Sequence, residues 1–312
     1  MKRITFTEYA RECIANLEKD GRYSTAHLYV NALRSYTEYL NKPIILFRDL
    51  SREKLMNYQR WLLSRHKSLN TVSTYMRMLR SIYNKGVDAG HANYILRLFH
   101  DVYTGVDTPH KKSLPRNELH TLLYEDPGTD VLRRTQCAAR LLYQLCGMPF
   151  VDLAYIRKSD IIDGVLVYHR IKTGVKVCVK ILQPVIDTVH RLYSLPCYPE
   201  NKNSSYALDI LSDKNMQKTF LGYSEYQSAL RGFNFRLSLL AQRLGIRSHI
   251  SSYTFRHSWA TTAKNTGASI EMISELLGHK SIRTTQIYLS SFNTAELAKV
   301  NRRACSYIES VK

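Results

Sequence analysis

The chain has 312 residues, 44% of them hydrophobic, which excludes an intrinsically disordered protein and allows about two globular domains. Lys and Arg number 45 against 26 Asp and Glu, so the net charge is +19. Such an excess favours a polyanionic partner, nucleic acid before an anionic membrane, with solvated surface charge as the alternative explanation. No apolar run is long enough for a transmembrane helix, so we expect no membrane association.

The six cysteines are scattered along the chain, without a CxxC pair or a Cys/His spacing typical of a zinc site. Scattered thiols suit a reducing compartment, and the charged N-terminus has no apolar stretch typical of a signal peptide. We therefore expect a cytoplasmic protein that has no metal site and needs no cofactor.

Residues 1–101 are predicted to form an all-helical domain, because apolar residues recur at helical spacing along them. The predicted helices cover residues 7–21, 24–41, 51–66 and 69–90. The second of them carries the apolar residues Leu28, Val30, Leu33, Tyr36 and Leu40. Four helices in about 100 residues indicate one compact module.

Five basic residues are candidates for contacting DNA: Arg77, Arg80 and Lys85 in the fourth helix, and Lys111 and Lys112 between two prolines. Basic helix faces can bind phosphates, but they are often simply solvated, and both interpretations stay open. The lysine pair lies in residues 102–114, whose Gly, Pro and Thr content is typical of a linker. We place the domain boundary near residue 107.

Residues 115–312 are predicted to form a second domain that is mainly helical around a small antiparallel sheet, so the whole chain is α+β. Helices are expected over residues 114–126, 131–149, 233–246 and 268–279. In residues 165–172, the odd-numbered and even-numbered positions form two alternating sets of side chains. Thr173-Gly174 interrupts this alternation, and a valine at every second position resumes it from Val175. This pattern predicts a β-hairpin with Lys172 at the end of its first strand.

Four residues form a coherent set for attacking a phosphodiester. Arg256 precedes a predicted helix, His279 follows 23 residues later, Tyr288 nine after that, and Lys172 lies at the hairpin turn. Arginine binds phosphate oxygens, histidine adds a hydrogen bond, tyrosine supplies a nucleophile and lysine can protonate a leaving oxygen. Among 22 tyrosines a single one is more often a core or surface residue, so the joint spacing carries this hypothesis.

Several segments together resemble the tyrosine recombinases, also called phage-type integrases. LGHKSIRTTQIYL (277–289) resembles the family's histidine–tyrosine block, RHSWAT (256–261) its second-arginine block, and YHRIKTG (168–174) its hairpin lysine segment. Residues 68–90 are similar to the SAM-like core-binding domain of a bacterial subgroup, and residues 147–161 to that subgroup's segment around the first arginine. The resemblance covers nearly the whole chain.

The resemblance implies a site-specific DNA recombinase that integrates, excises or inverts DNA through a 3′-phosphotyrosine, without metal or cofactor. Tyr288 resembles the nucleophile, Arg256 the second active-site arginine, His279 the residue that supports the transition state, and Lys172 the general acid. The implied partners are double-stranded recombination sites and other copies of this chain. A tetramer is expected on paired sites, with a monomer or dimer when free. Residues 291–312 are expected to pack on a neighbouring protomer, and the alternative is a helix folded back on its own domain.

The sequence departs from the family pattern at the histidine of HxxR, where it has Tyr253. It also departs at the first active-site arginine, because Cys146 and Pro149 occupy the two positions where that arginine is found. Arg140 and Arg157 are nearby in sequence and could substitute for it. We therefore expect slow cleavage, and the alternative is a DNA-binding protein of the same fold whose cleavage is impaired or lost.

Overall fold

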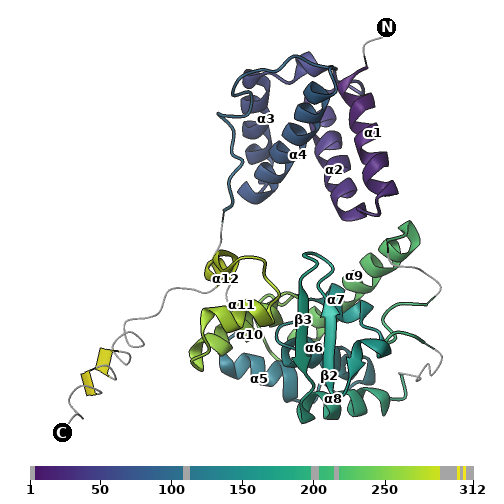
Figure 1. The fold of residues 1–312 in the computed structure, drawn as a ribbon, viewed down its shortest axis with the longest axis vertical. Coiled ribbons are helices and arrows are strands. Elements are labelled where there is room, and N and C mark those ends of the chain that lie inside the picture. The colour runs from purple at the N-terminus through teal and green to yellow at the C-terminus, as the bar shows by residue number, and fades with distance from the viewer. Residues whose placement is uncertain are drawn as a thin grey trace. The chain divides into compact units, whose positions relative to one another are not determined.

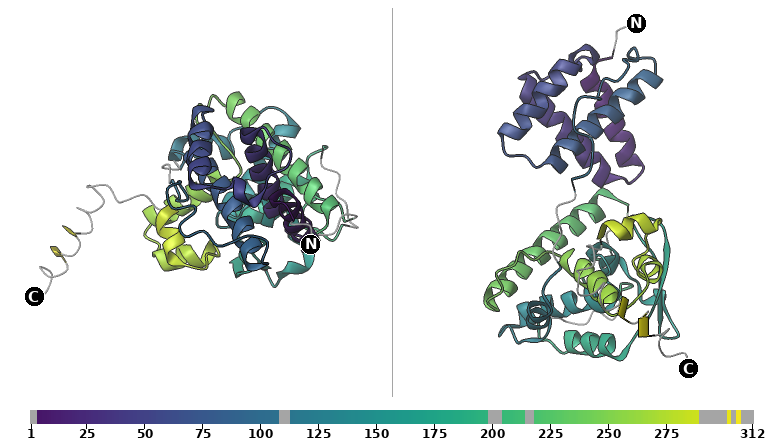
Figure 2. Two further views of the ribbon diagram at one scale, coloured as in Figure 1. Left: turned by 90° about the horizontal axis from the view of Figure 1, so that it is seen from above. Right: turned by 90° about the vertical axis from the view of Figure 1, so that its left-hand side faces the viewer.

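The computed structural model describes residues 4–107, 113–197, 204–213, 218–288, 301–302 and 305–306 (Figures 1 and 2). Lys111, Lys112, the side chain of Tyr288 and most of residues 291–312 lie outside this description. The chain divides into two compact units, Met1–Pro109 with Asn215–Ser224 and His110–Lys214 with Glu225–Lys312. None of the described helices is long and apolar enough to cross a membrane.

The first unit contains α1 (Phe6–Lys19), α2 (Tyr23–Leu40), a short 3₁₀ turn (Phe47–Asp49), α3 (Arg52–Ser64) and α4 (Leu69–Asp88). The four predicted helices are confirmed, and their starts have a local cause. The side chains of Thr5, Ser51 and Ser68 accept hydrogen bonds from backbone amides in the first turns of α1, α3 and α4. The helices pack side by side around one apolar cluster.

The buried stripe of α2 differs from the sequence expectation. Leu33 and Tyr36 of the predicted apolar set lie in the core together with Ala26 and Tyr29, whereas Leu28 and Val30 are 38% and 39% exposed. Residues 26, 29, 33 and 36 follow helical spacing, and positions 28 and 30 flank that stripe. Leu28 and Val30 therefore lie beside the core although they are apolar, and small or aromatic residues fill the buried stripe.

The rest of the chain is mainly helical around a three-stranded antiparallel sheet (Figure 1). Its helices are α5 (Arg116–Tyr124), α6 (Asp130–Gln144), α7 (Phe150–Tyr155), α8 (Gln183–Tyr193), α9 (Phe220–Arg243), α10 (Thr254–Asn265), α11 (Ile270–Leu276) and α12 (Ile282–Tyr288). The strands β1 (Ile161–Ile162), β2 (Val165–His169) and β3 (Lys176–Lys180) follow a 3₁₀ turn at Lys158–Asp160. The predicted mainly helical fold with a small antiparallel sheet is confirmed.

The hairpin of β2 and β3 turns earlier than the sequence pattern predicts. Pairing ends at His169 opposite Lys176, because the Arg170 carbonyl accepts hydrogen bonds from the Thr173 and Gly174 amides at 3.3 and 2.7 Å. Gly174 has a φ of +70°, which a glycine adopts without strain. Lys172 therefore lies in the turn and not at the end of β2 as predicted.

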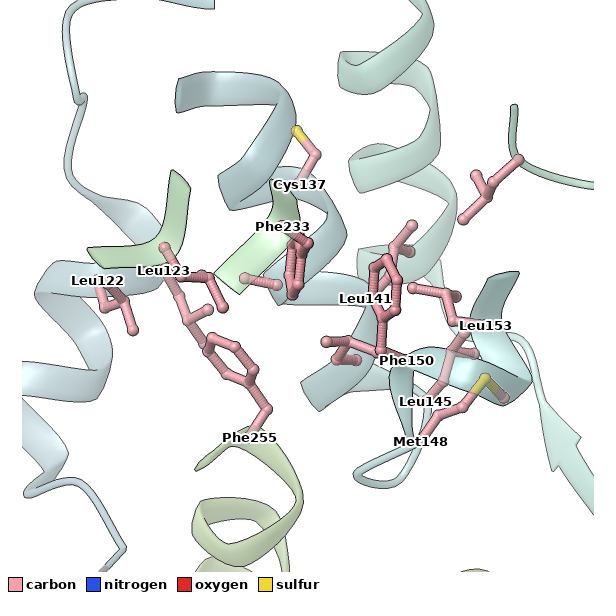
Figure 3. Close-up of a cluster of buried hydrophobic side chains, with 14 of the residues drawn as sticks. Leu122, Leu123, Cys137, Leu141, Leu145, Met148, Phe150, Leu153, Phe233 and Phe255 are labelled. Atoms are coloured by element: carbon pink, nitrogen blue, oxygen red, sulfur yellow. The ribbon is translucent and has the colours of Figure 1, made fainter. Parts of the chain in front are cut away.

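An apolar cluster beside the sheet fixes where the helices of the second unit lie (Figure 3). The rings of Phe150 on α7 and Phe233 on α9 stack with centroids 4.6 Å apart. Phe255 at the start of α10 is fully buried in the same cluster. Each such side chain contributes about 1.5–3 kcal/mol by leaving water. The position of α10, and of the residue that follows Phe255, is thereby set by the core.

Candidate active site

Arg256 is the most deeply buried of the predicted site residues, with 1% of its surface exposed. It lies inside the first turn of α10, so the expectation that it precedes the helix is wrong. Its Nη1 donates to the Gly147 carbonyl at 3.1 Å, and its Nη2 donates to the Leu277 carbonyl at 2.6 Å. The same Nη2 lies 2.9 Å from Nε2 of His279. The guanidinium is therefore held by groups from two separate segments, the residues before α7 and the end of α11.

The Leu277 carbonyl is presented to Arg256 by the way α11 ends. Gly278 has a φ of +63°. Its amide donates to the Glu275 carbonyl at 2.8 Å, and the His279 amide donates to the Ser274 carbonyl at 3.0 Å. This pair of bonds is a Schellman motif, which ends a helix and turns the chain away from it. His279 therefore follows directly after the turn, as the sequence predicted.

Contacts of His279 identify which ring nitrogen carries a proton. Arginine can only donate, so Nε2 accepts from Arg256, and Nδ1–H donates to Oγ1 of Thr285 at 2.8 Å. Burial, together with the charges of Arg256, Arg170 and Lys172, lowers the pKa of His279 to about 4. The histidine is therefore neutral at pH 7.

Arg170 is a second buried arginine at this site, 4% exposed. Its Nη1 donates to the same Leu277 carbonyl that accepts from Arg256. Its Nε forms an ion pair with Oδ2 of Asp152 at 2.5 Å, and Oδ1 of Asp152 accepts from the Ile171 amide at 2.9 Å. Burial raises the pKa of the Asp152 carboxyl, and Arg170 opposes that rise. Two guanidinium groups and one carboxylate thus meet at the end of α11.

Neither Arg170 nor Asp152 was identified as a site residue from the sequence, although a signal was present. Arg170 continues the alternating set of Leu166 and Tyr168, and both of those side chains are buried. A charged residue on the inward side of a strand needs a buried partner, because an unpaired charge there is costly. The partner, Asp152, lies on a different element and could not be assigned from spacing.

The remaining predicted residues lie around this cluster. Lys172 is exposed in the hairpin turn, and its charge reaches His279. Thr173 in the same turn donates its hydroxyl hydrogen bond to the Gly278 carbonyl at 3.2 Å, which joins the turn to the end of α11. Tyr288 is the last residue of α12, and the buried Thr285 one turn earlier is hydrogen-bonded to His279. The structure therefore brings together Lys172, Arg256, His279 and the helix that ends with Tyr288.

The positions that depart from the family pattern have other surroundings. Cys146 has a φ of +57° and packs half-buried against the apolar cluster, and burial raises the pKa of its thiol to about 11. Pro149 precedes the first turn of α7. Tyr253 precedes α10, and its ring lies edge-on to the His257 ring, with centroids 5.2 Å apart.

Neither arginine considered as a substitute is aimed at Arg256. The Nε of Arg140 donates to the Leu123 carbonyl, and its guanidinium lies 4.8 Å from the centroid of the Tyr124 ring. The guanidinium of Arg157 lies 5.7 Å from the centroid of the Tyr206 ring. Both are engaged with segments that do not belong to the cluster.

Comparison with known proteins shows to which family the chain belongs. Residues 112–294 match the Phage integrase family, and residues 5–95 match the Phage integrase SAM-like domain. The chain belongs to the phage integrase family. The predicted membership in the tyrosine recombinases, and with it in a family of enzymes, is confirmed.

Relatives within this integrase family cover most of the chain. Tyrosine recombinase XerD of Listeria monocytogenes serotype 4b (strain F2365) is 26% identical over 280 residues, 87% of this chain and 89% of the relative. Tyrosine recombinase XerC of Roseiflexus sp. (strain RS-1) is 28% identical over 251 residues, 78% and 75% of the two chains. A lambda integrase (75–356) dimer bound to a COC′ core site has a similar fold, with a TM-score of 0.66, 14% identity and coverage of 91% and 95%.

The basic residues predicted to contact DNA in the SAM-like region have different environments. Arg77 and Arg80 are half-buried on α4, and Nε of Arg77 donates to the Ser73 carbonyl at 3.4 Å. Lys85 is exposed, with its ammonium 5.7 Å from the centroid of the Tyr29 ring. Within the described part of this integrase, no group of three or more His, Cys, Asp or Glu residues could hold a metal ion.

Proposed function

We propose that this integrase is a site-specific recombinase that cuts and rejoins double-stranded DNA through a covalent bond to Tyr288. The observation that carries the proposal is the charge at the end of α11. Arg256, Arg170 and Lys172 surround His279, and the one carboxylate in the described cluster is Asp152. A local surplus of positive charge attracts a phosphate diester. The XerD and XerC relatives are named tyrosine recombinases, which supports the same conclusion.

In the proposed cleavage step, the phenolic oxygen of Tyr288 attacks the scissile phosphorus and the bond to the 5′ oxygen breaks. Lys172 donates a proton to the leaving oxygen, which becomes a 5′ hydroxyl, and the phenol proton is released to water. Arg256 and His279 neutralise charge on the non-bridging oxygens as it develops. A 5′ hydroxyl from a partner strand reverses the step, so the phosphodiester energy is retained and no cofactor is consumed.

Arg256 must exchange partners when DNA binds. In the free protein its Nη2 donates to the Leu277 carbonyl and lies against His279. A phosphate oxygen is a stronger acceptor than a neutral histidine nitrogen, because the bond is charge-assisted at both ends. An anion beside His279 also favours its protonated form, which can then donate to the phosphate. We infer that His279 changes from acceptor to donor on binding.

Assembly on DNA is a further part of the proposal. A lambda integrase tetramer bound to a Holliday junction has a similar fold, with a TM-score of 0.63, 13% identity and coverage of 93% of this chain and 78% of that one. We propose that this chain also forms a homo-tetramer on paired sites, with residues 291–312 packed on the neighbouring protomer. These residues lie mostly outside the described structure.

A protein of the same fold that binds recombination sites without efficient cleavage is the second candidate. Cys146 and Pro149 favour it, because neither side chain can bind a phosphate as an arginine does. Both candidates predict similar DNA binding, so only the rate of single-turnover cleavage separates them.

The test begins with selection of a binding site from random duplexes by the purified full chain. A nicked version of that site loses a short 5′-hydroxyl fragment on cleavage and traps the covalent complex. We expect an adduct that survives denaturant with the unmodified chain and no adduct with Tyr288→Phe, although both bind DNA with the same steep salt dependence. Absence of any adduct with the unmodified chain would support the binding-only candidate, and a flat salt profile would contradict both.

A further inference from the structure

We propose that Arg170 performs the task of the missing first arginine and binds a non-bridging oxygen of the scissile phosphate beside Arg256. This inference rests on the proposed function. If the inference holds, the absence of an arginine from residues 146–149 does not slow cleavage, because the hairpin supplies the second guanidinium.

The two arginines share one acceptor. Nη1 of Arg170 and Nη2 of Arg256 both donate to the Leu277 carbonyl, so the two guanidinium groups are adjacent. They approach it from different elements, since Arg170 follows β2 and Arg256 belongs to α10. The carbonyl end of a helix carries partial negative charge, which stabilises two cations that would otherwise repel each other. A phosphate that replaces the Leu277 carbonyl as acceptor of either arginine would therefore be close to both guanidinium groups.

Arg170 also has a free donor for that phosphate. Its Nε is occupied by Asp152 and its Nη1 by the Leu277 carbonyl. Among the described residues, no group accepts a hydrogen bond from its Nη2. Asp152 is itself fixed by the Ile171 amide, so it acts as a positioning residue that sets the orientation of the guanidinium.

A purely structural role does not explain an arginine at this position. Leu166 and Tyr168 precede it on the same inward side of the hairpin, and an apolar residue would continue that core. Replacing a buried ion pair by apolar residues of similar volume is often neutral or stabilising. The pair thus gives no clear gain in stability over an apolar core. A buried guanidinium beside Arg256 instead has a direct use in binding an anion.

The other candidate positions do not offer this geometry. Cys146 packs against the apolar cluster, and Gly147 after it lies against α10, where an added Cβ would be 3.0 Å from Cα of Arg256. Arg140 is 7% exposed and is bonded to α5 through the Leu123 carbonyl. Arg140 is therefore a useful control, because it is a buried arginine of the same unit without a place at the site.

The test compares single-turnover cleavage by the full chain on the selected site. In the double variant Arg170→Gln with Asp152→Asn, two neutral groups that can still hydrogen-bond replace the ion pair, so no buried charge is left unpaired. We expect cleavage to fall about 10²–10³-fold, the effect of losing one donor to a developing oxyanion, with unchanged DNA binding. Arg140→Gln should change cleavage by less than about threefold. Thermal unfolding and binding show whether each variant is folded.

A neutral methylphosphonate at the scissile position gives a readout that a structural role would not move. The substitution removes the negative charge that Arg170 is proposed to balance, so the double variant should recover most of its loss on this substrate. Arg170→Lys, which keeps the charge and loses the fork, should be intermediate on the phosphodiester and serves if the double variant does not fold. Equal losses on both substrates, or unimpaired cleavage by folded variants, would overturn the inference while leaving the proposed function intact. No adduct with the unmodified chain would overturn both.

Discussion

Gly278→Ala tests whether the end of α11 holds the two arginines together. Gly278 has a φ of +63°, where an L-residue costs about 1–2 kcal/mol. In addition, an added Cβ would lie 2.7 Å from Cγ of Arg170 and 2.7 Å from Cγ2 of Val177. Overpacking of this kind costs a further ~1–3 kcal/mol. We expect a total loss of about 2–5 kcal/mol in the free energy of unfolding.

Gly245→Ala provides a matched control. Gly245 ends α9 with the same pair of backbone bonds, its amide to the Gln242 carbonyl and the Ile246 amide to the Ala241 carbonyl. Its φ is +70°, and an added Cβ there would meet nothing within 4 Å. Urea unfolding should therefore show only the backbone cost for Gly245→Ala, and single-turnover cleavage should fall in Gly278→Ala alone. Equal losses of stability in the two variants would show that contact with Arg170 does not require glycine at position 278.

Three further predictions concern His279, its partner and the C-terminal segment. The pKa of His279 is about 4 in the folded protein and near 6.5 when unfolded, so the unfolded state binds the proton more readily as the pH falls. The free energy of unfolding should therefore be highest above pH 6.5 and decrease toward pH 4. Urea unfolding should show a decrease that is about 1–3 kcal/mol larger in the unmodified chain than in His279→Gln. Parallel pH profiles of the two chains would contradict this. Thr285→Val removes the acceptor of the His279 Nδ1–H, so cleavage should slow about tenfold at unchanged DNA affinity, whereas the exposed control Thr284→Val should cleave normally. Truncation after Phe292 should spare binding to a single site and abolish pairing of two sites in a gel-shift assay, and normal recombination by the truncated chain would count against a role in assembly.

Local patterns were sufficient for most of the fold. The caps at Ser51 and Ser68, the stop at Gly278 and the alternation of residues 165–169 depend on neighbours in sequence, and each element forms near its predicted place. The burial of α2 was less predictable, because Leu28 and Val30 are apolar and only packing shows that they flank the core. Hydrophobic residues are often exposed, so composition alone cannot select the buried stripe.

Only those residues of the site that belong to sequence motifs could be predicted. Spacing and family resemblance identified Arg256, His279 and Lys172, which the structure brings together. Arg170 was seen as a strand residue only, since its role depends on Asp152 and on the Leu277 carbonyl, which are 18 and 107 residues away. Contacts of that range follow from the packing of α7, the hairpin and α11, and no local pattern encodes them.

Identification of the residue that carries DNA after cleavage decides whether Tyr288 is the nucleophile. The trapped adduct from the nicked site would be digested with protease and nuclease, and the phosphorylated peptide located by mass spectrometry. We expect the phosphate on Tyr288, in the peptide that begins after Arg283 when trypsin is used. A phosphate on another residue, such as Tyr253, would contradict that assignment.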